Sequence, residues 1–249
     1  TRKILLKKFK GKKVLITGHT GFKGSWLSMW LNHLGAKIIG VSNNIPTKPS
    51  NFKTNKLKNK VKHLIVDIRY KKKLSQIIKK NKPDFIFHLA AQSSVPISVN
   101  HFYRSSSNNL NSSIKVFEIA KKYSVPVVYA SSSALYGNLP VGNDIKNKFD
   151  ISSPYAQDKL TLEKYAEMFF KVFHISSCGL RFFNVYGPNQ NANSPYSAVV
   201  PIFINNMKKN LPITINGGYQ TRDFIYVDDV IKLIEISMKK IQTKKDHCV

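Results

Sequence analysis

Residues 14–24 read Val-Leu-Ile-Thr-Gly-His-Thr-Gly-Phe-Lys-Gly, an apolar run that leads directly into a glycine-rich turn. The apolar run predicts a short buried strand at 14–17, and the residues from about 24 to 34 follow a helical pattern. Glycines suit such a turn because the backbone must bend sharply and approach a pyrophosphate closely, and the helix N-terminus then binds the charge. The stretch therefore predicts a dinucleotide site at Gly18, Thr20, Gly21, Phe22, Lys23 and Gly24.

Strands and helices alternate through the rest of the N-terminal half. Apolar runs predict strands at 37–41, 61–66, 85–89 and 127–130, and helical periodicity predicts helices at 72–80 and 109–122. This alternation indicates an α/β fold, a doubly wound parallel sheet of the Rossmann type. We expect residues 1–175 to form the dinucleotide-binding domain. Residues 176–249 are expected to form a small, incomplete substrate-binding annex, with about 222–240 returning to the first domain, and the polar stretch 43–60 to be an exposed excursion.

The composition restricts the class of protein. The 249 residues contain 40 Lys and Arg against 13 Asp and Glu, a net charge of +27. Because the lysines are spread along the whole chain, we interpret them as a solvated surface that attracts anionic nucleotides, with polyanion binding as the weaker alternative and no nucleic-acid partner expected. Two cysteines without a CxxC pair and seven scattered histidines give no metal-ligand spacing. Without an apolar run long enough for a signal peptide or a membrane span, a cytoplasmic protein with no membrane partner is expected.

The residues after the second and third predicted strands bear on the choice of cofactor. NAD sites usually place an acidic residue after the second strand to bind the ribose hydroxyls, whereas this chain reads Val41-Ser42-Asn43-Asn44. No arginine stands there for a 2′-phosphate, so NAD is favoured and NADP stays open as an alternative. Asp67 and Ile68, at the end of the third strand, are placed to contact adenine, although an ordinary polar strand end is nearly as good an interpretation.

A serine and a tyrosine-lysine pair predict the reacting centre. Ser132 ends the fifth strand, at the sheet edge where α/β proteins bind ligands. Tyr155 follows it by 23 positions and Lys159 lies one helical turn later on the same face. Ser153 is the predicted N-cap of this helix and Pro154 its first residue. A phenol with a pKa of about 10 becomes a base near neutrality only where cations favour the phenolate, so we expect Lys159 to lower the pKa of Tyr155 and Ser132 to hydrogen-bond the reacting oxygen.

Further motifs carry a family resemblance that covers the chain from Val14 to about Asp229. They are His88-Leu89-Ala90-Ala91-Gln92, Asn109, Arg181-Phe182-Phe183-Asn184-Val185-Tyr186-Gly187-Pro188, Ala198-Val199-Val200-Pro201, and the stretch 217–229 with Arg222. With these motifs the chain resembles the extended short-chain dehydrogenase/reductase family of NAD-dependent epimerases and dehydratases. The resemblance implies that Leu89, Ala90 and Ala91 border the cofactor and that Asn109 ties strands together. It also implies a homodimer, and it implies contacts to a nucleotide-diphosphate sugar for Gln92, Asn184, Val199 and Arg222.

The resemblance divides between two reactions. Residues 18–31 and 46–52 resemble CDP-glucose 4,6-dehydratases, whereas 131–133, the Asn184 loop and 194–201 resemble UDP-sugar 4-epimerases, notably those that act on UDP-N-acetylglucosamine. A dehydratase must also remove the C5 proton and expel the C6 hydroxyl, and relatives assign this work to acidic or basic side chains directly after the catalytic serine or threonine. Here those positions are Ser133 and Ala134. We therefore expect a nucleotide-sugar 4-epimerase in which Ser133 is a further catalytic residue beside Ser132. Tyr155 and Lys159 are expected to contact the cofactor as well. A 4,6-dehydratase is the first alternative, and a noncatalytic dinucleotide-binding module is the alternative of another class.

Relatives normally continue well past the stretch 217–229, with strands and helices that complete the substrate-binding domain. This chain ends 20 residues beyond Asp229. The expectation is therefore either a truncated product or fragment, or an unusually small nucleobase pocket.

Overall fold

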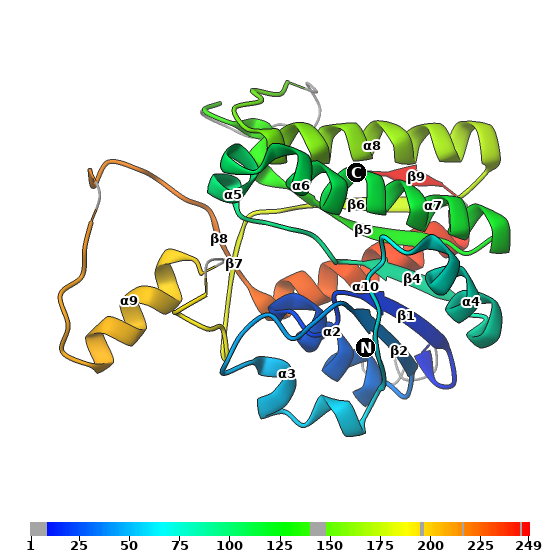
Figure 1. The fold of residues 1–249 in the computed structure, drawn as a ribbon, viewed down its shortest axis with the longest axis horizontal. Coiled ribbons are helices and arrows are strands. Elements are labelled where there is room, and N and C mark those ends of the chain that lie inside the picture. The colour runs from blue at the N-terminus through cyan, green and yellow to red at the C-terminus, as the bar shows by residue number, and fades with distance from the viewer. Residues whose placement is uncertain (1–8, 140–147, 195–196, 216, 245) are drawn as a thin grey trace.

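The computed structural model describes residues 9–139, 148–194, 197–215, 217–244 and 246–249. Its main sheet has seven strands in the order β3-β2-β1-β4-β5-β6-β9, all paired in parallel, with helices on both faces (Figure 1). The strands are β1 (Lys13–Thr17), β2 (Lys37–Ser42), β3 (Lys62–Ile65), β4 (Phe85–His88), β5 (Val127–Ser132), β6 (Ser177–Phe182) and β9 (His247–Cys248). A two-stranded parallel sheet pairs β7 (Asn184–Tyr186) with β8 (Phe224–Tyr226). The strand order reverses between β1 and β4, which creates at their carboxyl ends the crevice where such sheets bind dinucleotides.

The helices form two layers, each over its own hydrophobic core. One core lies under α2 and α10 and includes Leu27 and Ile234, and the other lies under α4, α7 and α8 and includes Phe117 and Leu162. The helices are α2 (Phe22–His33), α3 (Asn51–Thr54), α4 (Lys71–Asn81), α5 (Val95–Asn100), α6 (Phe102–Ser106), α7 (Ser112–Tyr123), α8 (Pro154–Phe173), α9 (Val199–Lys208) and α10 (Val227–Lys244), with 3₁₀ turns η1 (Leu57–Asn59) and η3 (Ser133–Tyr136) and a π-helical turn η2 (Ser107–Asn111). The two layers leave the strand ends open, and the candidate site lies there.

The main sheet confirms the predicted fold class, and β1 to β5 match the five predicted strands to within two residues. The sequence does not predict β6, because Ser-Cys-Gly-Leu-Arg-Phe is not an apolar run. Its glycine has a packing reason: a Cβ at Gly179 would lie 2.6 Å from the ring of Tyr129 on β5. The parallel sheet therefore continues past residue 175 to Phe182, seven residues beyond the expected boundary.

The C-terminal segment returns to the main sheet over a longer range than 222–240. Helix α10 packs in the same core as α2, and β9 pairs with the end of β6. This pairing places the Sγ atoms of two free cysteines, Cys178 and Cys248, 2.7 Å apart. The division of the chain at residue 175 therefore describes the connectivity less well than a single sheet with a small annex between β6 and α10.

The stretch 43–60 is mostly exposed, as its polarity predicts, but it is attached to the core. It contains α3 and η1, and it buries Phe52 and Leu57 in the core against α2. Two apolar side chains among many polar ones are enough to attach a short segment to a helix, because each contributes about 1.5–3 kcal/mol on full burial. The stretch also contacts the loop after β7. The side-chain amide of Asn189 donates to Asn51 Oδ1 (3.1 Å), and that of Asn191 donates to the carbonyl of Pro49 (2.8 Å).

The annex consists of the loop after β7, α9 and the chain that leads to β8. Figure 1 shows α9 standing away from the main sheet on two long connections. Its apolar residues Ile204 and Met207 are exposed, as are Leu211 and Ile215 beyond it. Across the part of the chain that the structure describes, no helix combines the length and apolar character needed to cross a membrane.

Candidate active site

A cavity of about 1570 Å³ opens at the carboxyl ends of the parallel strands. This is larger than the roughly 300–1,000 Å³ of a site for one drug-sized ligand, so it has room for two nucleotide-sized ligands. The predicted residues that line it are Gly18, Thr20, Gly21, Phe22, Lys23, Gly24, Asp67, Ile68, Leu89, Ala90, Ala91, Gln92, Ser132, Ser133, Tyr155, Asn184 and Arg222. Lys159 and Val199 do not line it. Lys159 lies behind Tyr155, and Val199 begins α9, directly after the lining residue Ala198.

The glycine turn fits the pyrophosphate of a dinucleotide. Gly18 has a φ of +75°, and a Cβ there would lie 2.8 Å from the amide nitrogen of Ala90. A Cβ at Gly24 would collide with the carbonyl oxygen of Gly18, so the turn can be this tight only without side chains at these positions. No side chain caps α2 at Gly21, and its first turn has no acidic residue. The amide donors and the positive end of the helix dipole therefore face the cavity, where they suit an anion.

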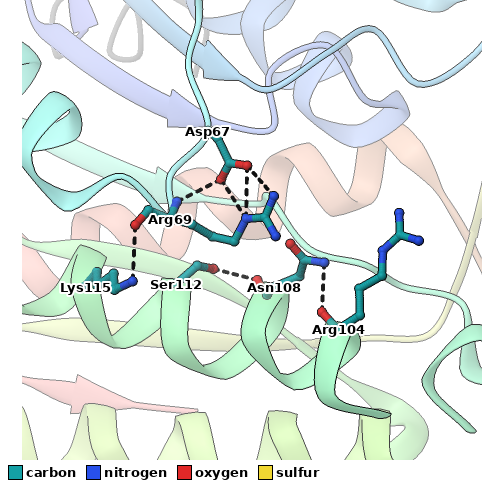
Figure 2. A network of polar contacts seen from close by, with 6 residues as sticks. All are labelled: Asp67, Arg69, Arg104, Asn108, Ser112 and Lys115. Carbon is teal, nitrogen blue, oxygen red and sulfur yellow. Dashed lines mark hydrogen bonds and ion pairs between the residues drawn. The ribbon is translucent and has the colours of Figure 1, made fainter. Parts of the chain in front are cut away.

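One wall of the cavity, which includes Asp67 and Ile68, lies beyond β2 and β3. The Thr20 hydroxyl donates to the carbonyl of Asn44 (2.7 Å), which attaches the turn to the end of β2. Asp67 faces Arg69, which donates to both carboxylate oxygens (Figure 2). These hydrogen bonds, more than any other influence, lower the pKa of Asp67. Both carboxylate oxygens of Asp67 therefore already accept hydrogen bonds from an arginine of the protein. Ile68 contributes an apolar side chain to the same wall.

The helix beside Asp67 supplies further polar groups to the same wall. Figure 2 shows Arg104 and Asn108 next to the Asp67–Arg69 pair, and both residues line the cavity. The Asn108 side chain donates to the carbonyl of Arg104 (2.9 Å), while Lys115 donates to the carbonyl of Arg69 (3.1 Å). The contact of Lys115 holds the segment after β3 against α7, and the contact of Asn108 is local to α6 and η2.

The segment after β4 is held by buried hydrogen bonds. The Ala90 amide donates to Thr17 Oγ1 (3.2 Å) and the Gln92 amide to Asn109 Oδ1 (2.8 Å), so Asn109 ties this segment to η2. His88 lies between the hydroxyls of Thr17 and Ser113 (2.7 Å each). Burial, and secondarily the charge of Lys159, lower its pKa to about 3, so this histidine is a neutral structural group near pH 7. Leu89, Ala90 and Ala91 are thereby presented to the cavity in a fixed position.

Ser132 and Tyr155 meet at the end of β5. Helix α8 begins as predicted, because Ser153 accepts a hydrogen bond from the Ala156 amide (3.2 Å) and Pro154 is its first residue. This places the buried phenol of Tyr155 beside the Ser132 side chain, and both residues line the cavity. Burial raises the pKa of Tyr155, and the neighbouring Ser132 hydroxyl only partly opposes this. The lowered pKa expected from Lys159 is therefore absent here, because desolvation of the phenolate dominates.

Lys159 supports the tyrosine from behind. Its Nζ donates to the carbonyl of Ala130 (2.7 Å) and lies 5.7 Å from the centroid of the Tyr155 ring. Burial, and secondarily the charge of Lys23, lower its pKa to about 8. Lys159 is therefore a buried, readily titrated cation one helical turn from the phenol.

A buried ion pair next to this centre escapes the sequence reasoning. Glu163 and Arg181 are 5% and 10% exposed, and Arg181 donates two hydrogen bonds to the carboxylate (3.0 and 2.8 Å). The Ser131 hydroxyl also donates to Glu163, and Arg181 donates to the Tyr136 hydroxyl (3.2 Å). The spacing of Tyr155, Lys159 and Glu163, four residues apart on one helix face, is the signal that could have found it.

The substrate side is more open. The side chain of Asn184 donates to the carbonyl of Asp223 (2.9 Å), and the exposed Arg222 donates to the carbonyl of Thr221 (2.6 Å). Gln92 donates through its side chain to the carbonyl of Ser94 (2.9 Å). Among the described residues, no group of three or more His, Cys, Asp or Glu side chains is arranged to hold a metal ion.

The fold and the site together define a class of protein. A parallel sheet with the β3-β2-β1-β4-β5-β6 order, a glycine turn after β1 and a serine-tyrosine-lysine set at the end of β5 are features of the short-chain dehydrogenase/reductase enzymes. A sequence model of the NAD dependent epimerase/dehydratase family matches residues 14–248. The chain belongs to this family, whose cofactor is NAD.

Curated and solved relatives include both epimerases and dehydratases. The chain is 34% identical over 225 residues to a putative UDP-glucose 4-epimerase of Methanocaldococcus jannaschii, covering 88% of this chain and 71% of that protein. It is 29% identical over 232 residues to the CDP-glucose 4,6-dehydratase of Salmonella typhimurium, covering 88% of this chain and 64% of that protein. The UDP-glucose 4-epimerase of Thermotoga maritima superposes with a TM-score of 0.84 at 30% identity, over 91% of this chain and 73% of that one. The UDP-N-acetylglucosamine 4-epimerase of Methanobrevibacter ruminantium gives 0.83 at 32% identity, over 96% and 76%. The chain thus spans about two thirds to three quarters of the length of these relatives.

Proposed function

We propose that this protein is a nucleotide-sugar 4-epimerase that uses NAD and acts on a UDP-glucose or UDP-N-acetylglucosamine type of substrate. The observation that carries the proposal is that Ser132 and Tyr155 line the same cavity wall, with Lys159 behind the tyrosine and with Ser133 and Ala134 directly after Ser132. NAD, when bound, accepts a hydride from C4 of the sugar and returns it to the opposite face. The fit of the glycine turn to a pyrophosphate supports this choice of cofactor.

Tyr155 acts first as the base and then as the acid. As a phenolate it takes the proton of the C4 hydroxyl while hydride leaves the same carbon, and it returns the proton once hydride has come back. Because burial raises the pKa of the free phenol, the phenolate depends on nearby positive charge, which Lys159 supplies at 5.7 Å from the ring. Ser132 stays hydrogen-bonded to the reacting oxygen and stabilises the charge that develops there.

Arg222 and Asn184 bind the diphosphate of the substrate. Arg222 presents a planar guanidinium with five donors, which suits the paired oxygens of a diphosphate. Both side chains line the cavity. The net charge of +27 adds a long-range attraction for the anionic substrate. We place Gln92 beside the sugar and Val199 at the edge of the nucleobase site.

The dehydratase is the second candidate, favoured by the resemblance of the glycine turn and by the relative in Salmonella typhimurium. It needs an acid and a base at C5 and C6, and the two residues after Ser132 provide neither at neutral pH. A noncatalytic dinucleotide-binding module would have no use for the Ser132–Tyr155 pair. We also propose that the enzyme acts in the cytoplasm as a homodimer. The exposed apolar residues Val99, Phe102 and Tyr103 on α5 and α6 are candidates for the subunit contact.

The test is to incubate the protein and NAD with UDP-glucose, UDP-galactose and their N-acetyl forms, and to measure the C4 configuration by proton NMR. Interconversion at C4 that is lost in Tyr155→Phe supports the epimerase. A 4-keto-6-deoxy product would support the dehydratase instead. Equal, negligible turnover by wild type and Tyr155→Phe would favour the noncatalytic module. Light scattering of the same preparation tests the dimer.

A further inference from the structure

Lys23 points toward the reacting end of the cavity. It is the second residue of α2 and lines the cavity, and its Nζ lies 4.3 Å from the ring centroid of Phe182 at the end of β6. Its charge acts on Lys159, whose own Nζ is bonded to the carbonyl of Ala130 on β5. The ammonium of Lys23 therefore lies beneath the ends of β5 and β6, where Tyr155 is, and away from the cavity wall that includes Asp67.

This ammonium has no anionic partner within the described ranges. Every ion pair found there uses other cations. The interactions found for the Lys23 ammonium are with the ring of Phe182 and, through its charge, with Lys159. Burial lowers its pKa to about 8, so it is still mostly protonated at neutral pH. A partly buried charge without a partner is unfavourable, and a hydrophobic residue at this position would pack against Phe182 without that penalty. A function for the charge would explain its presence.

The charge of the nicotinamide changes during the reaction. When the substrate alcohol is oxidised, its C4–H bond releases a hydride and its hydroxyl proton goes to the Tyr155 phenolate, which leaves a ketone. The hydride converts NAD⁺ to NADH, and the nicotinamide ring loses its positive charge. A fixed cation nearby repels the oxidised ring but not the neutral reduced ring.

We propose that Lys23 is a second cation of the reacting centre, which makes the protein bind NADH in preference to NAD⁺. This inference depends on the proposed function only in that it requires a nicotinamide dinucleotide in the cavity. Its consequence is that the ketone and NADH formed in the first half of the reaction are held together until hydride returns. If Lys23 instead contacted the pyrophosphate, its replacement would change the two dissociation constants in a different way. NAD⁺ and NADH carry the same pyrophosphate, so losing such a contact would weaken both by the same factor.

The experiment compares the dissociation constants of NAD⁺ and NADH for the cofactor-free, 249-residue protein. Calorimetric titration gives both constants without any turnover. The variants are Lys23→Met and Lys23→Gln, which remove the charge and differ in polarity, with Lys72→Met on the exposed face of α4 as the matched control. In both Lys23 variants the ratio Kd(NAD⁺)/Kd(NADH) is expected to fall by about tenfold or more at neutral pH, from the Coulomb interaction of two charges several ångströms apart. Lys72→Met is expected to keep the wild-type ratio.

Two results would overturn the proposal. If both affinities fall in parallel and the ratio is unchanged, Lys23 binds the phosphates or only packs. If wild type binds neither dinucleotide, the role of Lys23 and the proposed function fail together. The proposed function can also fail while the role of Lys23 holds. If the ratio Kd(NAD⁺)/Kd(NADH) depends on Lys23 but the protein does not interconvert substrates at C4, the role of Lys23 is supported and the epimerase is refuted.

Discussion

Replacing Lys23 by methionine is expected to stabilise the cofactor-free protein. Burial lowers the pKa of Lys23 from 10.5 to about 8. One pKa unit corresponds to about 1.4 kcal/mol, so holding this ammonium in the folded chain costs about 3 kcal/mol at neutral pH. The residue is only partly buried, and solvent screening reduces this figure. We therefore expect Lys23→Met to increase the free energy of unfolding by about 1–3 kcal/mol, because a methionine of similar length packs against Phe182 without a charge.

The gain should disappear at high pH. Below pH 8 Lys23 is protonated in both the folded and the unfolded chain, so the whole cost is present. Between pH 8 and pH 10.5 only the unfolded chain binds the proton, and the wild type becomes more stable relative to the variant as pH rises. Above pH 10.5 lysine is neutral in both states and the difference vanishes.

Urea unfolding of the cofactor-free proteins, followed by circular dichroism at about pH 7 and about pH 9.5, measures this difference. Lys72→Met, an exposed replacement on α4, is expected to change stability by less than about 0.5 kcal/mol at either pH. A Lys23→Met protein that is no more stable than wild type at neutral pH, or a gain that does not shrink with pH, would refute the reasoning. If Lys23→Met is more stable than wild type and no longer prefers NADH, the lysine lowers the stability of the protein but is needed for its function.

Three other variants test the site and the fold. Tyr155→Phe is expected to lower kcat by about 10²–10⁴-fold, because that is the usual contribution of a positioned proton-transfer group. The affinity for NAD, measured by calorimetry, is expected to stay within about threefold of the wild-type value. A turnover rate within about tenfold of wild type would exclude Tyr155 as the base. Glu163→Gln is expected to lower the free energy of unfolding in urea by about 3–5 kcal/mol, since it leaves the buried guanidinium of Arg181 without its carboxylate. A loss below about 1 kcal/mol would contradict a dry ion pair. Phe52→Ala is expected to cost about 3–5 kcal/mol in the same assay, and an unchanged midpoint would mean that the stretch 43–60 does not pack on α2.

The features that the sequence predicts well are those that a few neighbouring residues determine. An apolar run marks a buried strand wherever it occurs, and the turn from Gly18 to Gly24 needs glycines for reasons local to the backbone. The start of α8 at Ser153 and Pro154 is a local capping signal in the same way. Because parallel strands end at the same edge of a sheet, these local signals also bring most of the predicted lining residues into one cavity.

The features that the sequence misses depend on contacts between distant segments. Strand β6 is recognisable only once Tyr129 of β5 is known to fill the space above Gly179. The partner of Glu163 is Arg181, on a strand that the periodicity does not predict. The pKa of Tyr155 was expected to fall because a lysine lies one turn away, but desolvation depends on everything packed around the phenol, and it has the larger effect.

The hydrogen bonds between the stretch 43–60 and the loop after β7 have a kinetic consequence. Asn51, Asn189 and Asn191 all line the cavity, so the contacts Asn189–Asn51 and Asn191–Pro49 close part of its wall between segments about 140 residues apart in the chain. Opening of these two hydrogen bonds would widen the path by which a dinucleotide enters or leaves the cavity. We therefore expect these contacts to slow the exchange of a bound dinucleotide with the solution. Slow exchange suits an oxidant that is regenerated in place, because the same dinucleotide molecule can serve many turnovers.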